Sequence, residues 1–108
     1  MIYTVVLTRT AETDLGETVD YISRILDNRP AAESLLNQIE QRIDGLSDYP
    51  EAHPLVADTH LRERGIRVFT VGNYVGLYRV RTDEQKVVLL RFLHGRRDWQ
   101  SLLLEDAP

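Results

Sequence analysis

The hydrophobic residues of this chain repeat with two different periods, and the change of period falls at Gly65. Before it, apolar residues recur at three- and four-residue steps, which is typical of amphipathic helices. After it, they alternate in three runs, 66–71, 74–81 and 86–93, as strands half buried in a sheet do. The sequence therefore predicts an α+β fold in which two helices precede most of the strands.

The first half predicts a strand followed by a helical hairpin. The run 2–7 is β-branched and aromatic, which favours a strand. Thr8 or Thr10 can cap the first helix, which should end near Asp27, and Pro30 suits the first turn of the second helix. The apolar stripes comprise Ala11, Leu15, Val19, Ile22 and Leu26, then Ala32, Leu35, Leu36, Ile39, Ile43 and Leu46. Because so few residues separate them, the two helices must run antiparallel.

Residues 47–64 carry two prolines and no clear period, so we expect a long loop there. In the second half, Gly72-Asn73 suits a two-residue hairpin turn, and 82–85 forms a four-residue connection. A short helix over 97–104 would complete the order β-α-α-β-β-β as one domain spanning residues 1–108.

These turns predict the sheet register. They place Arg67 opposite Tyr78, Tyr78 opposite Leu89, and Gly76 opposite Arg91, with free space at Gly76. One face is then almost wholly apolar, and we expect the helical hairpin to pack there. That face carries Ile66, Val68, Thr70, Val75, Leu77, Arg79, Val88, Leu90 and Phe92. The opposite face carries Arg67, Phe69, Tyr74, Gly76, Tyr78, Leu89, Arg91 and Leu93.

Composition excludes several kinds of protein. The chain has no cysteine, so it is not a disulfide scaffold and has neither a thiolate nucleophile nor a cysteine-bearing zinc site. It has no apolar run of the ~20 residues that a membrane span needs. His53 and His60 flank Asp58 without convincing metal-ligand spacing, and there is no phosphate- or dinucleotide-binding motif. We therefore expect a cytoplasmic protein with no cofactor, metal or membrane partner.

The net charge of −4 conceals two halves of opposite sign. Residues 1–58 hold eleven acidic residues against four arginines, which gives −7, and residues 59–108 hold nine basic against six acidic, which gives +3. Such a division predicts a positive face for nucleic acid, a nucleotide or an acidic protein segment. The alternative is an ordinary solvated surface. The acidic residues of the first helix are expected to face solvent.

The candidate binding residues lie on the predicted open face of the sheet and in the turn after its last strand. They are Arg67, Tyr74, Tyr78, Arg91, His94, Arg96 and Arg97. Histidine can act as acid or base near neutral pH, and arginine can hold phosphate or carboxylate. In the alternative interpretation, His94 only bonds a backbone carbonyl, Asp98 pairs with Arg96 or Arg97, and Trp99 anchors the tail in the core.

Six segments of the chain have a characteristic order and spacing: Thr10–Leu15, Val19–Ile22, Leu46–Pro50, Gly65–Arg67, Gly72–Val80 and Leu90–Trp99. Together they resemble the RelE/ParE superfamily of bacterial type II toxin–antitoxin toxins. The resemblance spans nearly the whole chain, and it implies the same helical hairpin on a sheet. It also implies a cognate antitoxin as partner.

The resemblance leaves the cellular target open. RelE-like members cleave mRNA on the ribosome, and the candidate catalytic residues would then be Arg67, Tyr78, Arg91, His94 and Arg97. ParE-like members inhibit DNA gyrase. In many RelE-like chains an arginine follows the tyrosine after the hairpin turn, whereas here Val75 follows Tyr74. This difference favours the ParE-like interpretation. A non-toxic binding module on the same fold is the third possibility.

Overall fold

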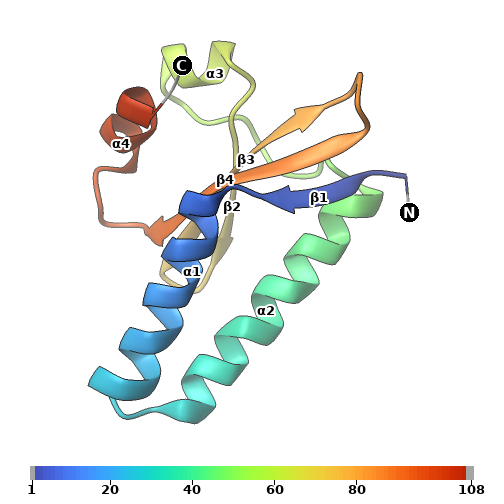
Figure 1. Cartoon of the computed structure of the whole chain (residues 1–108). Helices are drawn as coiled ribbons and strands as arrows, with labels where there is room; N and C mark the ends of the chain where they lie inside the picture. Colours follow the sequence, from blue (N-terminus) through green and yellow to red (C-terminus); the bar gives the residue numbers. More distant parts are fainter. Residues whose placement is uncertain (1, 107–108) are drawn as a thin grey trace.

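The computed structural model describes residues 2–106, and it places a four-stranded sheet between a long helical hairpin and two short helices (Figure 1). The elements are β1 (Thr4–Leu7), α1 (Arg9–Asp20), η1 (Tyr21–Ile25), α2 (Arg29–Asp48), α3 (Thr59–Glu63), β2 (Arg67–Val71), β3 (Tyr74–Arg81), β4 (Lys86–His94) and α4 (Trp99–Asp106). The predicted α+β architecture and the order of its main elements are confirmed. The short helix α3, inside the segment predicted as a loop, was missed.

The sheet has the order β1-β4-β3-β2, so the last strand of the chain lies in its interior. β4 pairs antiparallel with β3 but parallel with β1, which makes the sheet mixed. Thr8 joins β1 to the helical layer, because its hydroxyl accepts a hydrogen bond from the amide of Ala11 and donates one to the carbonyl of Leu90 at 2.9 Å. Thr8 is therefore the cap of α1, one of the two caps predicted.

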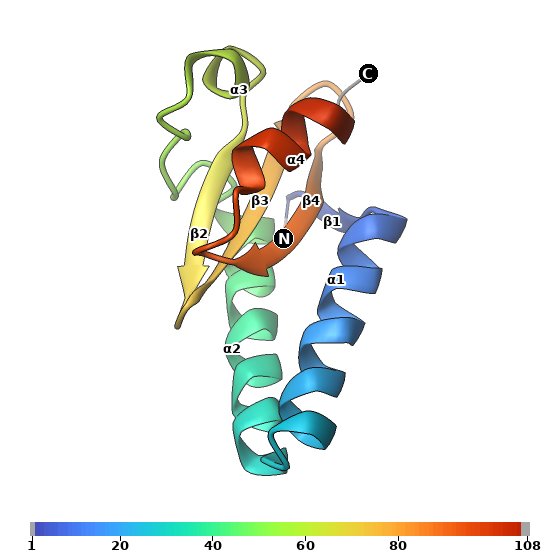
Figure 2. The same cartoon turned by 90° about the vertical axis from the view of Figure 1, so that its left-hand side faces the viewer.

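The helical hairpin contains a π-helical turn at its tip (Figure 2). α1 continues into η1, where the amide of Leu26 donates to the carbonyl of Tyr21. The extra residue in this turn rotates the helix surface, and Leu26 is left 55% exposed. Its predicted place in the buried stripe was therefore wrong. Asn28 caps α2 and Pro30 lies in its first turn, as predicted for Pro30.

The predicted hairpin turns are correct, but the register of β4 changes within the strand. Arg67 lies opposite Tyr78, and Tyr78 opposite Leu89, as predicted. A bulge between Leu77 and Tyr78 then shifts the pairing, so that Gly76 faces Phe92 rather than Arg91. A bulge adds one residue to one strand, and turn lengths alone do not reveal it.

The helical hairpin packs on the face opposite to the one predicted. The cluster beneath it contains Ala11, Ile22, Ala32, Leu35, Ile39, Leu46, Phe69, Val71, Tyr78, Val87, Leu89 and Phe92. The other face of the sheet is apolar as well, and α3, α4 and the segment before α3 cover it. The cluster on that side contains Val56, Leu61, Ile66, Val75, Leu77 and Leu103. With apolar residues on both faces, alternation does not identify the face that the long helices cover.

Gly76 has no free space beside it, contrary to prediction. A Cβ atom built on Gly76 would overlap the far edge of the ring of Phe69, at Cζ, and Phe69 is the residue directly opposite on β2. The glycine therefore leaves the space that this ring occupies.

The predicted loop also covers one edge of the sheet. Leu55 forms a bridge with Arg67, and the amide of Val68 donates to the carbonyl of Pro54 at 3.0 Å. α4 begins at Trp99, two residues later than predicted. Trp99 packs against the second cluster, which confirms that it anchors the tail. Asp98 accepts bonds from the amide and hydroxyl of Ser101 and so caps this helix.

Candidate functional site

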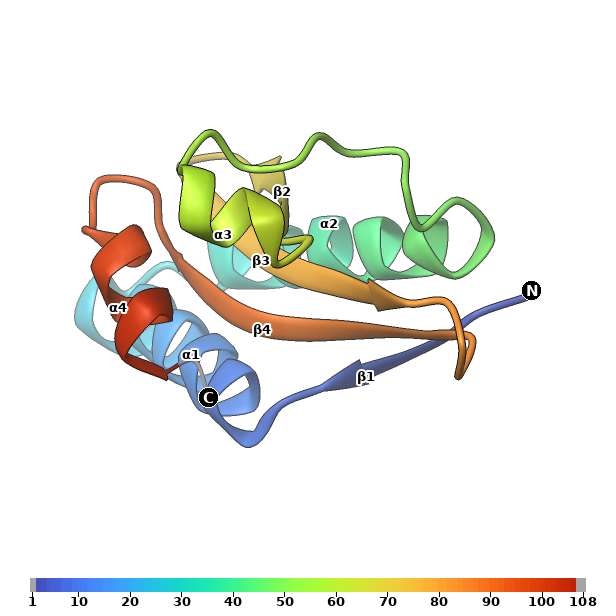
Figure 3. The same cartoon turned by 90° about the horizontal axis from the view of Figure 1, so that it is seen from above.

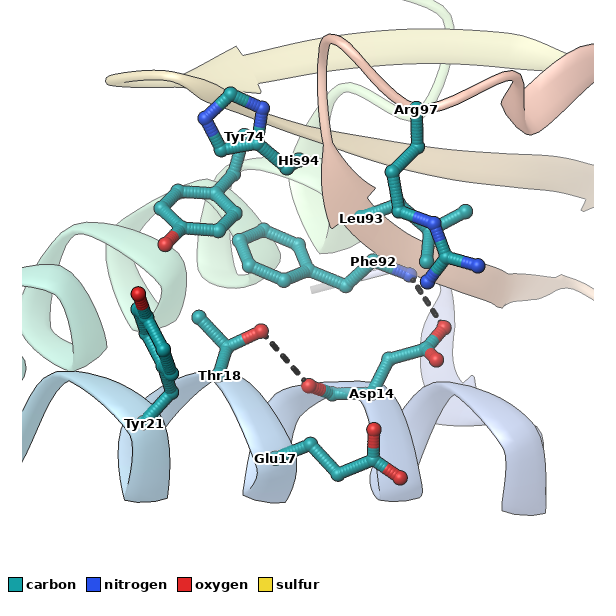
Figure 4. Close-up of a pocket in the computed structure, with 9 residues that line it drawn as sticks. All are labelled: Asp14, Glu17, Thr18, Tyr21, Tyr74, Phe92, Leu93, His94 and Arg97. Carbon is teal, nitrogen blue, oxygen red and sulfur yellow. Dashed lines mark hydrogen bonds between the residues drawn. The ribbon is translucent and has the colours of Figure 1, made fainter. Parts of the chain in front are cut away.

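A pocket of about 370 Å³ opens where α1 meets the end of β4 (Figure 4). Its walls come from α1, η1, the first residue of β3, the end of β4 and the turn that follows. The lining residues are Asp14, Glu17, Thr18, Tyr21, Tyr74, Phe92, Leu93, His94 and Arg97. Three of the predicted binding residues, Tyr74, His94 and Arg97, therefore meet in one pocket.

Asp14 forms the fixed base of the pocket. Its carboxylate accepts hydrogen bonds from Nε and Nη2 of Arg91, at 2.8 and 3.1 Å, and from the backbone amide of Phe92 at 3.0 Å. Charge-assisted bidentate pairs of this kind fix both side chains in place. The expectation that every acidic residue of the first helix faces solvent was wrong for Asp14, because α1 packs beside the end of β4 and brings this carboxylate to Arg91 and the amide of Phe92.

The aromatic side of the pocket is a short stack. The ring of Tyr74 lies nearly parallel to Phe92, with centroids 5.5 Å apart, and meets His94 edge-on at 5.3 Å. Nδ1 of His94 accepts the backbone amide of Arg96 at 3.1 Å. A histidine with Nδ1 in this role carries its proton on Nε2 when neutral. The alternative expectation was that His94 bonds a backbone carbonyl; the bond observed is instead accepted from a backbone amide.

The basic side of the pocket is the turn after β4. Arg96 and Arg97 are exposed, and the amide of Arg97 donates to the carbonyl of His94 at 3.0 Å. Gly95 fixes the turn to the β2–β3 hairpin by donating its amide to the carbonyl of Asn73 at 2.8 Å. The guanidinium groups of Arg96 and Arg97 therefore project from a turn whose backbone is fixed by hydrogen bonds. This arrangement suits recognition of an anionic or polar surface.

Four predicted site residues do not line this pocket. Arg96 lies in the adjoining turn, and the other three lie elsewhere in the fold. Tyr78 is fully buried, and its hydroxyl donates to the carbonyl of Pro50 at 2.8 Å. Arg67 donates to the carbonyl of His53 at 2.7 Å and pairs with Glu51 at 3.3 Å. Arg91 is held by Asp14, below the pocket. Their predicted position on an open face was wrong, because the helical hairpin and the segment after it cover that face.

Burial changes the pKa of two residues in the layer between the sheet and the segment after α2, Tyr78 and His53. The pKa of Tyr78 is raised, first of all by burial of its hydroxyl. The pKa of His53 is lowered, first by burial against Phe69 and Tyr78 and then by the charge of Arg42. Both shifts favour the neutral form. Tyr78 belongs to the core and the partly buried His53 packs against it, so neither residue lines the pocket.

Sequence reasoning missed Asp14 and Tyr21. Tyr21 is half exposed at the tip of α1, and its ring points toward Tyr74 across the pocket (Figure 4). Asp14 and Tyr21 lie seven positions apart, which is two helical turns, so the sequence already placed them on one face of the helix. Nowhere in the described part of the chain do three or more histidine or carboxylate side chains gather as metal ligands would.

The chain matches the family model described as the ParE toxin of the type II toxin–antitoxin system parDE, over residues 5–99. The chain belongs to this toxin family. A comparison of sequences with curated proteins gives no match. Within residues 2–106, none of the toxin's helices combines the length and the hydrophobicity needed to cross a bilayer.

The toxin shares its fold with solved toxin–antitoxin structures. The chromosomal ParDE system of P. aeruginosa superposes with a TM-score of 0.67 at 18% identity, covering 86% of this chain and 96% of that one. The RelBE2 toxin–antitoxin complex of Mycobacterium tuberculosis gives 0.62 at 27% identity, covering 87% and 99%. The isolated E. coli RelE toxin gives 0.58 at 13% identity, covering 96% and 97%. The predicted membership of the RelE/ParE superfamily is confirmed.

Proposed function

We propose that this toxin arrests bacterial growth by binding DNA gyrase in the cytoplasm, in the ParE manner, and that a cognate antitoxin neutralises it. The match to the ParE model over residues 5–99 is the observation that carries this proposal. The pocket supplies a suitable contact surface, in which the half-exposed ring of Tyr21 faces Tyr74 beside His94 and Arg97, and the exposed Arg96 adjoins it in the same turn. Inhibition by binding needs only such a complementary surface.

The positions of the predicted catalytic residues support binding over RNA cleavage. Cleavage needs a group to accept the 2′-hydroxyl proton, a group to protonate the leaving oxygen, and cations for the phosphate. Tyr78 is buried, and Arg67 and Arg91 are held by carboxylates. His94 would have to carry most of the proton transfer, because arginine remains protonated at physiological pH.

The residue after Tyr74 supports the same proposal. Val75 is only 9% exposed and packs into the cluster beneath α3 and α4. The position that resembles a catalytic arginine of many RelE-like chains is therefore filled by a core residue.

Ribosome-dependent mRNA cleavage is the second candidate function. The observation that favours it is the common pocket of His94 and Arg97, which brings a titratable imidazole next to a cation. The two functions differ in how strongly they depend on His94.

The experiment is induction of the chain alone, with trapped gyrase–DNA complexes and mRNA cleavage in a translating extract measured side by side. We expect trapped gyrase–DNA complexes that persist in His94→Gln and disappear when Arg96 and Arg97 are both changed to Glu. The matched control changes Arg29 and Arg62, both exposed and outside the pocket, to Glu. Cleaved mRNA that disappears with His94→Gln would instead establish the ribonuclease.

A further inference from the structure

One end of the sheet is uncovered on the side away from the helical hairpin. Val5, Val80 and Val87 contribute to the cluster beneath the hairpin. Because successive residues of a strand point to opposite faces, their sequence neighbours point away from it. These neighbours are Val6, Arg79, Arg81, Lys86 and Val88, and we call them the basic sheet patch.

Strand pairing brings the members of the patch into two adjoining rows. Val6 lies beside Val88, which lies opposite Arg79. In the next row, Lys86 lies opposite Arg81. Seen from above, α3 and α4 lie over the other end of the sheet, and no helix lies over the end near the β3–β4 turn (Figure 3). Val6 and Val88 are consequently partly exposed, although they lie in neighbouring strands of the sheet.

The charge of the patch is only partly balanced within the chain. Arg81 is 3.6 Å from Glu84 and 4.0 Å from Asp83, both in the adjacent turn. In the part of the chain that the structure describes, neither Arg79 nor Lys86 has an ion pair. Two cations therefore flank a small aliphatic surface and have no carboxylate of their own.

We propose that the basic sheet patch is the docking surface for an acidic segment of the cognate antitoxin, an inference that rests on the proposed function. The segment would place an aliphatic side chain on Val6 and Val88 and carboxylates on Arg79 and Lys86. Residues on diagonal positions of paired strands are about 7–8 Å apart, and two carboxylates on one face of a peptide can match that spacing.

The chemistry of the patch favours a protein segment over a single nucleic acid strand. Proteins that bind single strands combine positive charge with aromatic rings on which bases stack. The patch has valines at its centre and no aromatic residue, whereas the aromatic rings of the toxin line the pocket on the other side of the sheet.

The test measures affinity of the purified toxin for the purified protein encoded by the adjacent open reading frame. The double variant Arg79→Glu/Lys86→Glu should weaken binding by roughly 10- to 100-fold, and rising salt should weaken wild-type binding more than that of the variant. The control with Glu at Arg29 and Arg62 makes the same change of charge elsewhere and should bind within about threefold of wild type. Thermal unfolding verifies that both variants fold.

A cellular readout separates this proposal from the proposed function. The patch variant should still arrest growth when induced alone, but coexpressed antitoxin should no longer rescue the cells. Unchanged affinity and full rescue would overturn the docking surface while leaving gyrase inhibition intact. Loss of binding to a single-stranded RNA probe, with antitoxin affinity unchanged, would assign the patch to nucleic acid and also overturn the proposal.

Discussion

Asp14 in the middle of α1 holds Arg91 at the bulge of β4, with 2.8 Å between Oδ2 and Nε. The side chains of Arg91 and Asp14 are only 12% and 9% exposed, and the same carboxylate also accepts the amide of Phe92. This pair attaches the first helix to the interior strand of the sheet. It also fixes the base of the pocket that presents His94 and Arg97.

Asp14→Ala should therefore be strongly destabilising. It leaves a nearly buried guanidinium without its carboxylate and the Phe92 amide without an acceptor, which costs about 3–5 kcal/mol in comparable buried pairs. Urea unfolding of wild type and variant measures the difference. The double change Asp14→Leu/Arg91→Met, which replaces both charges by apolar groups, should recover much of the loss. A loss below ~1 kcal/mol for Asp14→Ala would show that the pair is not important for stability.

Gly76→Ala should destabilise the sheet because its methyl group would overlap the ring of Phe69. Overpacking of this kind costs roughly 1–3 kcal/mol. Gly16→Ala is the matched control: a Cβ there meets nothing within 4 Å, and alanine favours helix by up to ~1 kcal/mol. The midpoint temperature of thermal unfolding should fall for Gly76→Ala and rise for Gly16→Ala. Equal shifts would contradict the close packing of the Phe69 ring against Gly76.

His53 should make the toxin less stable in mild acid. Burial lowers the pKa of folded His53, so the unfolded chain binds a proton more readily between that lowered pKa and about 6.5. Stability should then rise with pH through this window and level off above it. His53→Gln should reduce the difference between unfolding temperatures at pH 5 and pH 7.5, whereas the same change at exposed His60 should not. An unaltered difference would rule out His53 as its source.

Tyr78→Phe should lower stability at neutral pH by about 1–3 kcal/mol, because the carbonyl of Pro50 loses its buried donor. The raised pKa of Tyr78 adds a second effect: wild-type stability should fall above about pH 10, where the unfolded tyrosine ionises first. The variant should lose less stability in that range. Tyr49→Phe, at a side chain 72% exposed, serves as control and should leave denaturation curves unchanged.

The sequence was sufficient for the architecture but not for the orientation of the sheet. Turn residues such as Gly72-Asn73 act locally, so the pairing of Arg67 with Tyr78 could be predicted from them. The face that the long helices cover depends on how α3 and α4 bury the other side, and those short elements have weak patterns. The bulge at Leu77/Tyr78 is likewise a tertiary feature.

Only part of the candidate site could be predicted, because some of its residues depend on local signals and others on tertiary structure. Tyr74, His94 and Arg97 adjoin the ends of strands and the turn, where a modest error of register does little harm. Tyr78 and Arg91 lie inside strands, where the wrong face or one inserted residue changes what the side chain contacts. Asp14 looked like one of several acidic residues on α1, and only the tertiary structure brings it to Arg91.

The position of β4 has a consequence for synthesis of the toxin. β4 is the interior strand that both β1 and β3 require, yet it is the last strand to leave the ribosome. At about 5–20 residues per second, several seconds pass during which the α1–α2 hairpin has no sheet to cover. Closure of the sheet joins Thr4–Leu7 to Lys86–Leu89, segments about eighty residues apart. A nascent chain that stops before β4 is complete therefore lacks the strand that pairs with both β1 and β3, which delays the appearance of folded toxin until β4 has been synthesised.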